Sequence, residues 1–328
     1  MRWLTGLIVV LGCLWGGYWF VGKRGFEAAA RGGFETLRAS GKLATNSGLE
    51  VHGFPNRFDL TVTEPRFADP ATGFAWQAPF LQILSLSYKP WHLIAAFPTE
   101  QRLALPPESM VIRAAKLQAS VISKPQSLLP LDRLTLVGEA LEIMGDSGWT
   151  VKAEAVQFAT RLDESRTDWH ELGLNLSNLI PDARLMALFD GVLPAQVEMI
   201  RVDAHLGFTA PIDRMALATQ PQIAALELDD LRVDWGTMHV TAKGRMIADA
   251  AGFAEGDLVL RLENWRAVLD VAEAIGLLPP DQRKPWEQAA QFLATQSDGV
   301  ETIELPLQFK NGLTRLGPFS VGTAPRLR

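Results

Sequence analysis

Residues 200–208 read Ile-Arg-Val-Asp-Ala-His-Leu-Gly-Phe, and this stretch decides the fold class. Every second residue from Ile200 to Phe208 is apolar, and the residues between them are charged, polar or glycine. A β-strand points successive side chains to opposite faces, so the stretch predicts a strand with one apolar and one solvated face. Strands of this kind typically pair into antiparallel sheets that pack on one side and meet water on the other.

The same alternation recurs along most of the chain. It is found at 58–62, 84–88, 172–176, 231–235, 238–242, 258–262 and 303–309. Asn311-Gly312 follows the last of these segments, and both residues favour the positive φ that a tight hairpin needs. The sequence therefore predicts a mainly β fold, a β-rich α+β structure of curved antiparallel sheets.

A few segments have helical spacing and are expected to pack on the sheets. They lie at 182–190, at 265–275 and from Pro285 onward. Apolar residues between 26 and 37 also share one helical face, which predicts a helix that ends near Gly41.

The N-terminal segment predicts a membrane anchor. Residues 3–22 carry no charge, and twenty residues of helix span about 30 Å, the thickness of a bilayer's hydrocarbon core. Trp3 lies at one end and Tyr18 and Trp19 near the other, where amphipathic rings favour the membrane interface. The expected organisation is a transmembrane anchor at 1–24, a juxtamembrane helix at 25–41 and an exported domain at 42–328. Two halves of that domain are expected to meet near residue 181.

Three other interpretations of this segment fit its residues less well. A buried helix of a soluble protein is disfavoured by the position of the segment and by its tryptophan and tyrosine pattern. A cleaved signal peptide needs small residues at its cleavage site, whereas bulky aromatic residues fill 18–20. Cys13 has the surroundings of a lipoprotein cleavage box, but the residues after it remain membrane-like. The basic residues beyond the segment favour a cytoplasmic body, yet long domains are exported largely regardless of charge. We therefore expect an inner-membrane, single-pass protein with the bulk of the chain in the periplasm.

Composition restricts the partners. The 328-residue chain has a net charge of -6, and its first 24 residues carry three basic residues and no acidic one. The remaining chain is thus more acidic still and has no basic run, which argues against nucleic acid as a partner. Cys13 is the only cysteine, so the body after it contains no disulfide.

The sequence contains no specific catalytic motif, and no cofactor is expected. Gly145-Asp146-Ser147-Gly148 matches the nucleophile segment of trypsin-like proteases, but a glycine-rich run between two strands also describes a turn.

The histidines show no zinc spacing, so no metal site is expected. Asp203 and His205 share a strand face, and Asp234 and His239 flank a turn. If adjacent, they would form a metal or acid–base cluster. The favoured interpretation is the wet face of a sheet, with Glu171, Asp229 and Asp230 as solvated charges.

The tryptophans after the anchor offer a binding hypothesis. They either fill a thick core or line an apolar groove for an acyl chain. The groove candidates are Trp76, Trp91, Trp149, Trp235 and Phe208.

Several short segments together resemble a bacterial envelope family known as domain of unknown function 2125. They are 51–58, 75–79, 88–92, 233–236, 241–244, 305–307, 311–312 and 317–318. The likeness covers nearly the whole chain. The plan of strands and helices is similar, more distantly, to AsmA-type envelope proteins, which have an inner-membrane anchor and periplasmic sheets around an apolar groove. The latter resemblance implies a role in lipid movement or outer-membrane assembly.

The leading hypothesis is therefore a non-enzymatic protein that binds or handles lipid, or assists envelope assembly, through an apolar sheet groove. Its expected partners are the lipid bilayer and either a lipid ligand or another envelope protein. The first alternative is a scaffold for protein–protein interaction in the cell envelope. The second is an envelope hydrolase that uses Ser147 or the Asp203/His205 face.

Overall fold

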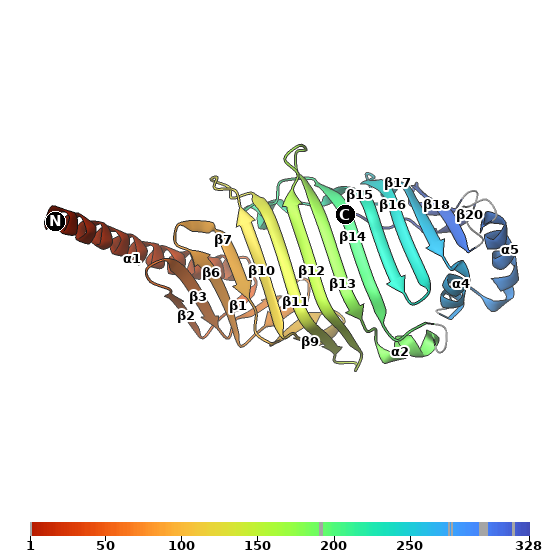
Figure 1. Cartoon of the computed structure of the whole chain (residues 1–328), viewed down its shortest axis with the longest axis horizontal. Coiled ribbons are helices and arrows are strands. Elements are labelled where there is room, and N and C mark those ends of the chain that lie inside the picture. Colours follow the sequence, from red (N-terminus) through yellow and green to blue (C-terminus); the bar gives the residue numbers. More distant parts are fainter. Residues whose placement is uncertain (1, 190–192, 275, 277, 295–300, 317–318) are drawn as a thin grey trace. The chain divides into compact units, whose positions relative to one another are not determined.

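The computed structural model describes residues 2–189, 193–274, 276, 278–294, 301–316 and 319–328 (Figure 1). The chain forms two compact units. Unit 1 comprises Met1–Pro125 and Leu136–Gly148, and unit 2 comprises Gln126–Thr135 and Trp149–Arg328. The division falls between residues 125 and 149, and Pro181 lies inside unit 2.

A single helix, α1 (Arg2–Ala39), forms the start of unit 1. The expected juxtamembrane helix continues the N-terminal segment without a break, and Gly41 follows the helix with a φ of 82°. Between residues 2 and 14 the large apolar side chains are exposed. The second half of α1 contacts the strands of unit 1, so the helix is fixed to its unit rather than joined by a flexible linker.

Two runs of antiparallel strands make up the rest of unit 1. The first run has the order β2 (Gly48–His52), β3 (Arg57–Thr63), β6 (Phe80–Leu86), β7 (Lys89–Ala96) and β10 (Lys116–Ser123). The second run has the order β1 (Leu43–Thr45), β4 (Arg66–Asp69), β5 (Phe74–Gln77), β8 (Glu100–Leu105), β9 (Glu108–Arg113) and the end of β11 (Leu131–Gly145).

The core of unit 1 lies between α1 and β3. Trp19 and Phe58 are 4% and 3% exposed, and their rings stack with centroids 6.2 Å apart. Phe26 stacks on the other side of Phe58 at 5.7 Å. Gly22 faces the same ring, and a Cβ at this position would lie 2.4 Å from the ring's Cζ. The helix therefore approaches the sheet closely because residue 22 has no side chain.

We expect Gly22→Val to destabilise the docking of α1 by about 1–3 kcal/mol, since Phe58 is held by two rings and has no room to move. Gly25→Val is the matched control, because nothing lies within 4 Å of a Cβ at Gly25. Denaturant unfolding of the full chain in detergent, followed by tryptophan fluorescence, measures both. Equal losses of stability in the two variants would contradict this packing.

Unit 2 is a meander in which each strand pairs antiparallel with the next. Its strands are β12 (Thr150–Leu162), β13 (Trp169–Leu179), β14 (Val197–Phe208), β15 (Ile223–Trp235), β16 (Met238–Ala248), β17 (Ala254–Glu263), β18 (Thr302–Lys310), β19 (Leu313–Leu316) and β20 (Phe319–Thr323). Asn311 and Gly312 join β18 to β19 with φ values of 54° and 71°, which confirms the predicted hairpin.

The expected helices are found in unit 2. Asp182 caps α2 (Ala183–Met186) by accepting from the Arg184 N–H, and a 3-10 turn at Ala187–Phe189 follows it. Helix α4 covers Trp265–Ala274. Helix α5 (Arg283–Ala294) begins two residues before Pro285, after a 3-10 turn at Pro280–Gln282. The short α3 (Ala216–Thr219) was not expected. The antiparallel sheets, the packing helices and the long apolar N-terminal helix confirm the predicted fold class.

Candidate functional site: the two faces of the unit 2 sheet

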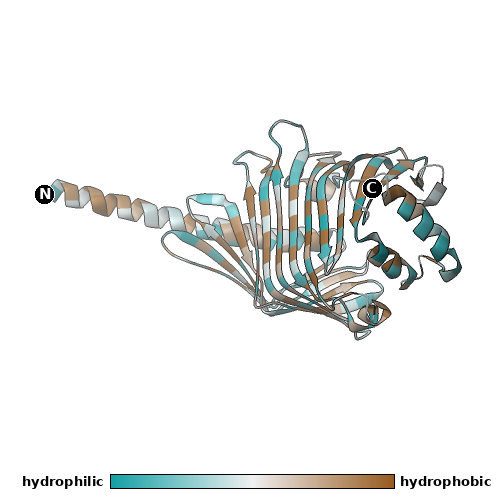
Figure 2. Ribbon diagram, turned by 45° about the vertical axis from the view of Figure 1, so that its right-hand side comes forward, coloured by the Kyte–Doolittle hydropathy of each residue, from teal (hydrophilic) through white to brown (hydrophobic). Residues whose placement is uncertain are grey.

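The register of unit 2 aligns apolar side chains into rows across the strands. Phe158 lies opposite Leu174, Leu174 opposite Val202, and Val202 opposite Leu231. A second row joins Val156, Leu176, Ile200, Val233 and Val240. We call the part of this surface on β12–β15 the apolar face. Figure 2 shows the alternation of apolar and polar residues along these strands.

The apolar face is only partly covered. Its large side chains, among them Leu174, Val202 and Leu231, are half-buried rather than buried. Helices α4 and α5 pack on β16 and β18, toward the other end of the sheet. Among the described residues, none of the hydrophobic clusters of unit 2 includes those three side chains. The middle of the sheet thus presents an apolar surface without the helical cover that its far end has.

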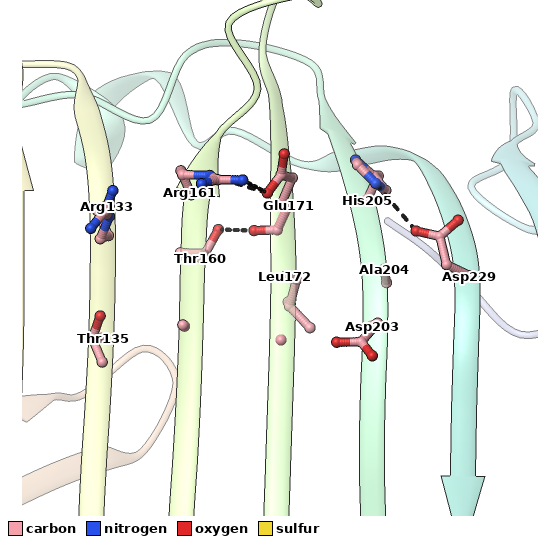
Figure 3. Close-up of a pocket in the computed structure, with 12 residues that line it drawn as sticks. Arg133, Thr135, Thr160, Arg161, Glu171, Leu172, Asp203, Ala204, His205 and Asp229 are labelled. Atoms are coloured by element: carbon pink, nitrogen blue, oxygen red, sulfur yellow. Dashed lines mark hydrogen bonds and ion pairs between the residues drawn. The ribbon is translucent and has the colours of Figure 1, made fainter.

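The opposite face of the same strands is polar. A depression of about 710 Å³ on it is lined by residues of β11 to β15 (Figure 3). Arg161 Nε donates to Glu171 Oε2 at 3.1 Å, and Arg201 Nε donates to Asp203 Oδ2 at 2.8 Å. The first of these ion pairs joins β12 to β13, and the second lies within β14.

His205 lies at one edge of this depression and belongs to a larger network. Arg166 donates to its Nδ1 at 2.7 Å, so Nε2 carries the proton and donates to Asp229 Oδ2 at 3.2 Å. Arg166 also bonds Asp163 and Glu227, and its guanidinium stacks on the Trp169 ring at 4.0 Å. His205 is thus oriented between a cation and a carboxylate as part of a polar network.

Hydrogen bonds shift the ionisation of this network. Ser165 and Arg166 both donate to Asp163 and hold the pKa of its carboxyl well below the usual range. Asp163 and Glu227 in turn raise the pKa of Arg166. Asp163 and Arg166 therefore both stay charged near neutral pH. This behaviour fits a structural network better than a group that exchanges protons.

The contact between Asp229 and His205 was not predicted from the sequence. The register of β14 with β15 shifts between Asp203 and Ala204, and β15 has an extra residue at Asp229-Asp230. This bulge turns Asp229 toward His205, although the carboxylate stays exposed to solvent, as expected. The sequence did contain a signal of this bulge, because two consecutive polar residues, Asp229 and Asp230, interrupt the alternation between the apolar residues Leu228 and Leu231.

The other sequence-derived candidates occupy separate places. His239 Nδ1 bonds Asp234 Oδ1 at 2.7 Å; burial acts to raise the pKa of Asp234, but the bonds from His239 and Arg232 lower it. Ser147 lies in an exposed turn of unit 1, where its N–H donates to Glu108. Within the described part of the chain, no group of three or more histidine, cysteine or acidic side chains is arranged to hold a metal ion.

The five groove candidates do not form one cluster. Trp76 and Trp91 belong to unit 1, and the Trp76 indole donates to Gln101 at 2.7 Å. Trp235 packs edge-on against Phe189 and donates to the Pro194 carbonyl at 2.8 Å. Phe208 lies at one end of the apolar rows. Trp149 is half-buried and directly precedes β12. Their role in ligand binding stays a prediction.

A buried histidine ends the apolar rows beside Phe208. His170 is 2% exposed, its ring meets Phe208 edge-on at 5.8 Å, and no hydrogen-bond partner reaches its Nδ1. Burial lowers the pKa of His170, while the carboxylates of Asp168 and Asp132 act in the opposite direction. The folded chain therefore keeps this ring neutral under conditions in which the unfolded chain protonates it.

We expect wild-type stability to fall as the pH drops below about 6.5, because the unfolded state then binds a proton that folded His170 does not. The contribution is at most about 1.4 kcal/mol per pH unit. His170→Leu removes it, so the variant should lose less stability than wild type between pH 7.5 and pH 5. Urea unfolding at several pH values measures this difference. Parallel pH profiles for the two proteins would contradict the assignment.

Helix α1 carries the predicted membrane residues. It is long and apolar enough to cross a membrane. Trp3 is 94% exposed, whereas Tyr18 and Trp19 donate to the carbonyls of Ser87 and Arg57 in unit 1. Tyr18 and Trp19, near the C-terminal end of the uncharged segment, are thus also hydrogen-bonded to the strands and turns of unit 1.

The family model DUF2125, described as an uncharacterized protein conserved in bacteria, matches residues 19–325. No curated protein and no solved structure matches the chain.

Proposed function

Because the chain belongs to the DUF2125 family of bacterial proteins, whose description names no activity, we propose a function from the chemistry of the molecule. The protein is a non-enzymatic, membrane-anchored lipid-binding protein. The apolar face of β12–β15 contacts the acyl chains of the lipid. The observation that carries this proposal is the row from Phe158 to Leu231, whose large side chains remain half-buried.

The hydrophobic effect supports an acyl chain as the occupant of this surface. Each methylene group removed from water contributes about 0.8 kcal/mol, so even a few methylenes on the apolar face give measurable affinity. The rows offer aliphatic side chains on four adjacent strands and no charged group between them. A linear hydrocarbon suits such a surface because it needs contact area but no directional partner.

The proposal includes a location. Helix α1 crosses the inner membrane and the body lies in the periplasm, where it meets lipids that leave this membrane. The ease with which long domains are exported supports this orientation. A phosphatase that is active only in the periplasm, fused to the C-terminus, tests this orientation independently of lipid binding.

Native mass spectrometry of the full chain, released from mild detergent, tests the lipid proposal, with extraction and identification of copurified lipid in parallel. The proposal predicts phospholipid or fatty acid at about one molecule per chain, retained after detergent exchange. A chain that stays empty after incubation with the lipids of its own membrane would overturn it. A stoichiometric protein partner in the absence of lipid would instead support the scaffold alternative.

A further inference from the structure

Two loops of unit 1 reach back along α1 toward its N-terminus. The loop between β2 and β3 (residues 53–56) places the Pro55 carbonyl 3.1 Å from the Trp15 indole nitrogen. The turn between β6 and β7 places the Ser87 carbonyl 2.6 Å from the Tyr18 hydroxyl. Both contacts fall within the uncharged segment 3–22 rather than beyond it.

The position of these contacts along α1 determines how deep the two loops lie in the membrane. Residues 2–14 precede the first contact and form about 20 Å of helix, which is a third less than the roughly 30 Å of a bilayer's hydrocarbon core. If the whole segment 3–22 is in the membrane, Trp15 lies about 10 Å inside the end at Gly22. Loops held at Trp15 and Tyr18 then enter the membrane with the helix.

The side chains at the tips of the loops suit this environment. Phe54 and Tyr88 are 58% and 53% exposed, although both are large aromatic residues. Phe54 lies against α1, with its ring 5.3 Å from Trp19 and 6.0 Å from Phe20. Aromatic rings of this kind are enriched at membrane–water interfaces.

Backbone carbonyls of the two loops have hydrogen-bond partners within unit 1, which suits a layer with little water. A carbonyl without a partner is costly there, since no solvent replaces the missing hydrogen bond. The carbonyls of Pro55, Ser87 and Arg57 accept from the side chains of Trp15, Tyr18 and Trp19, respectively. Asn56 contributes its carbonyl to the Ser87 N–H at 2.9 Å. Apolar tips and internally bonded carbonyls together favour insertion.

We propose that the two loops with Phe54 and Tyr88 at their tips form a docking surface for the lipid bilayer that α1 crosses. This surface inserts into the interfacial layer and sets the height of unit 1 on the membrane. It rests on the membrane anchor of the proposed function but not on lipid binding by unit 2. The inference applies whichever side of the membrane the body occupies.

Spin-label depth measurements on the full chain test this inference, in vesicles of phosphatidylethanolamine and phosphatidylglycerol. Phe54→Cys and Tyr88→Cys are each placed in a Cys13→Ser background, so that each chain carries one label. Native Cys13 is exposed on α1 and reports insertion of the helix itself. Ala71→Cys is the control in water, because Ala71 is exposed and its neighbour Asp69 pairs at 3.1 Å with Lys42, beyond the far end of α1.

The expected result is that labels at residues 54 and 88 are about tenfold less accessible to a water-soluble nickel chelate than the label at residue 71. Accessibility at 54 and 88 equal to that at 71, with Cys13 protected, would overturn the docking surface and leave the anchor in place. Exposure of Cys13 as well would overturn the anchor and the docking surface together. The Tyr88 variant keeps the test valid if Phe54→Cys fails to fold.

Discussion

Replacing Leu174 and Val202 with glutamine should remove bound lipid from the chain while the sheet stays folded. The two side chains lie opposite each other at the centre of the apolar face. An amide at either position presents a polar group to the acyl chain without a hydrogen-bond partner, at a cost of about 1–3 kcal/mol. The double variant should therefore bind lipid at least about tenfold more weakly. Quantifying lipid per purified chain measures the effect.

The matched control is Arg201→Gln on the opposite face of the same strand. Arg201 is exposed and pairs with Asp203, so its replacement alters the wet face and leaves the apolar face unchanged. Lipid content should equal that of wild type in this variant. Equal lipid content in the double variant and the control would show that the apolar face of β12–β15 is not where lipid binds.

Phe58→Ala should destabilise unit 1 by about 3–5 kcal/mol, the usual cost of removing a buried phenylalanine. Phe58 is 3% exposed, and its ring is stacked between Trp19 and Phe26 of α1. Truncation leaves a cavity between the helix and β3, so α1 loses its main contact with the sheet. Unfolding of the full chain in detergent, monitored by tryptophan fluorescence, measures the loss.

Phe80→Ala is the control for this prediction. Phe80 lies on β6 of the same unit and is 37% exposed, so its truncation opens no enclosed cavity. Its cost should be clearly smaller. If both truncations lowered the free energy of unfolding by the same amount, helix α1 would not be held by the aromatic stack.

The fold could be predicted because its main signal is local. Alternation in a strand such as 200–208 depends only on neighbouring residues, and Asn311-Gly312 defines a hairpin by backbone preference alone. Helix boundaries were predicted less accurately: α5 begins at Arg283 rather than Pro285, because a 3-10 turn leads directly into the helix.

The candidate site depended on contacts that no local pattern encodes. The half-buried state of Leu174 depends on where α4 and α5 dock, which the alternation of β13 does not reveal. The contact of Trp15 with Pro55 joins residues 40 positions apart. The bulge at Asp229-Asp230 was visible as a break in phase, but its result, a bond to His205, required the register of a neighbouring strand.

The most direct test of lipid contact at the apolar face is photocrosslinking in intact cells. A photoreactive amino acid replaces Leu174 in one chain and Asn175, on the opposite face of β13, in another. The account predicts a lipid adduct on the peptide that contains residue 174 and none on the one that contains residue 175. Absence of lipid from residue 174, or equal labelling at both positions, would contradict it.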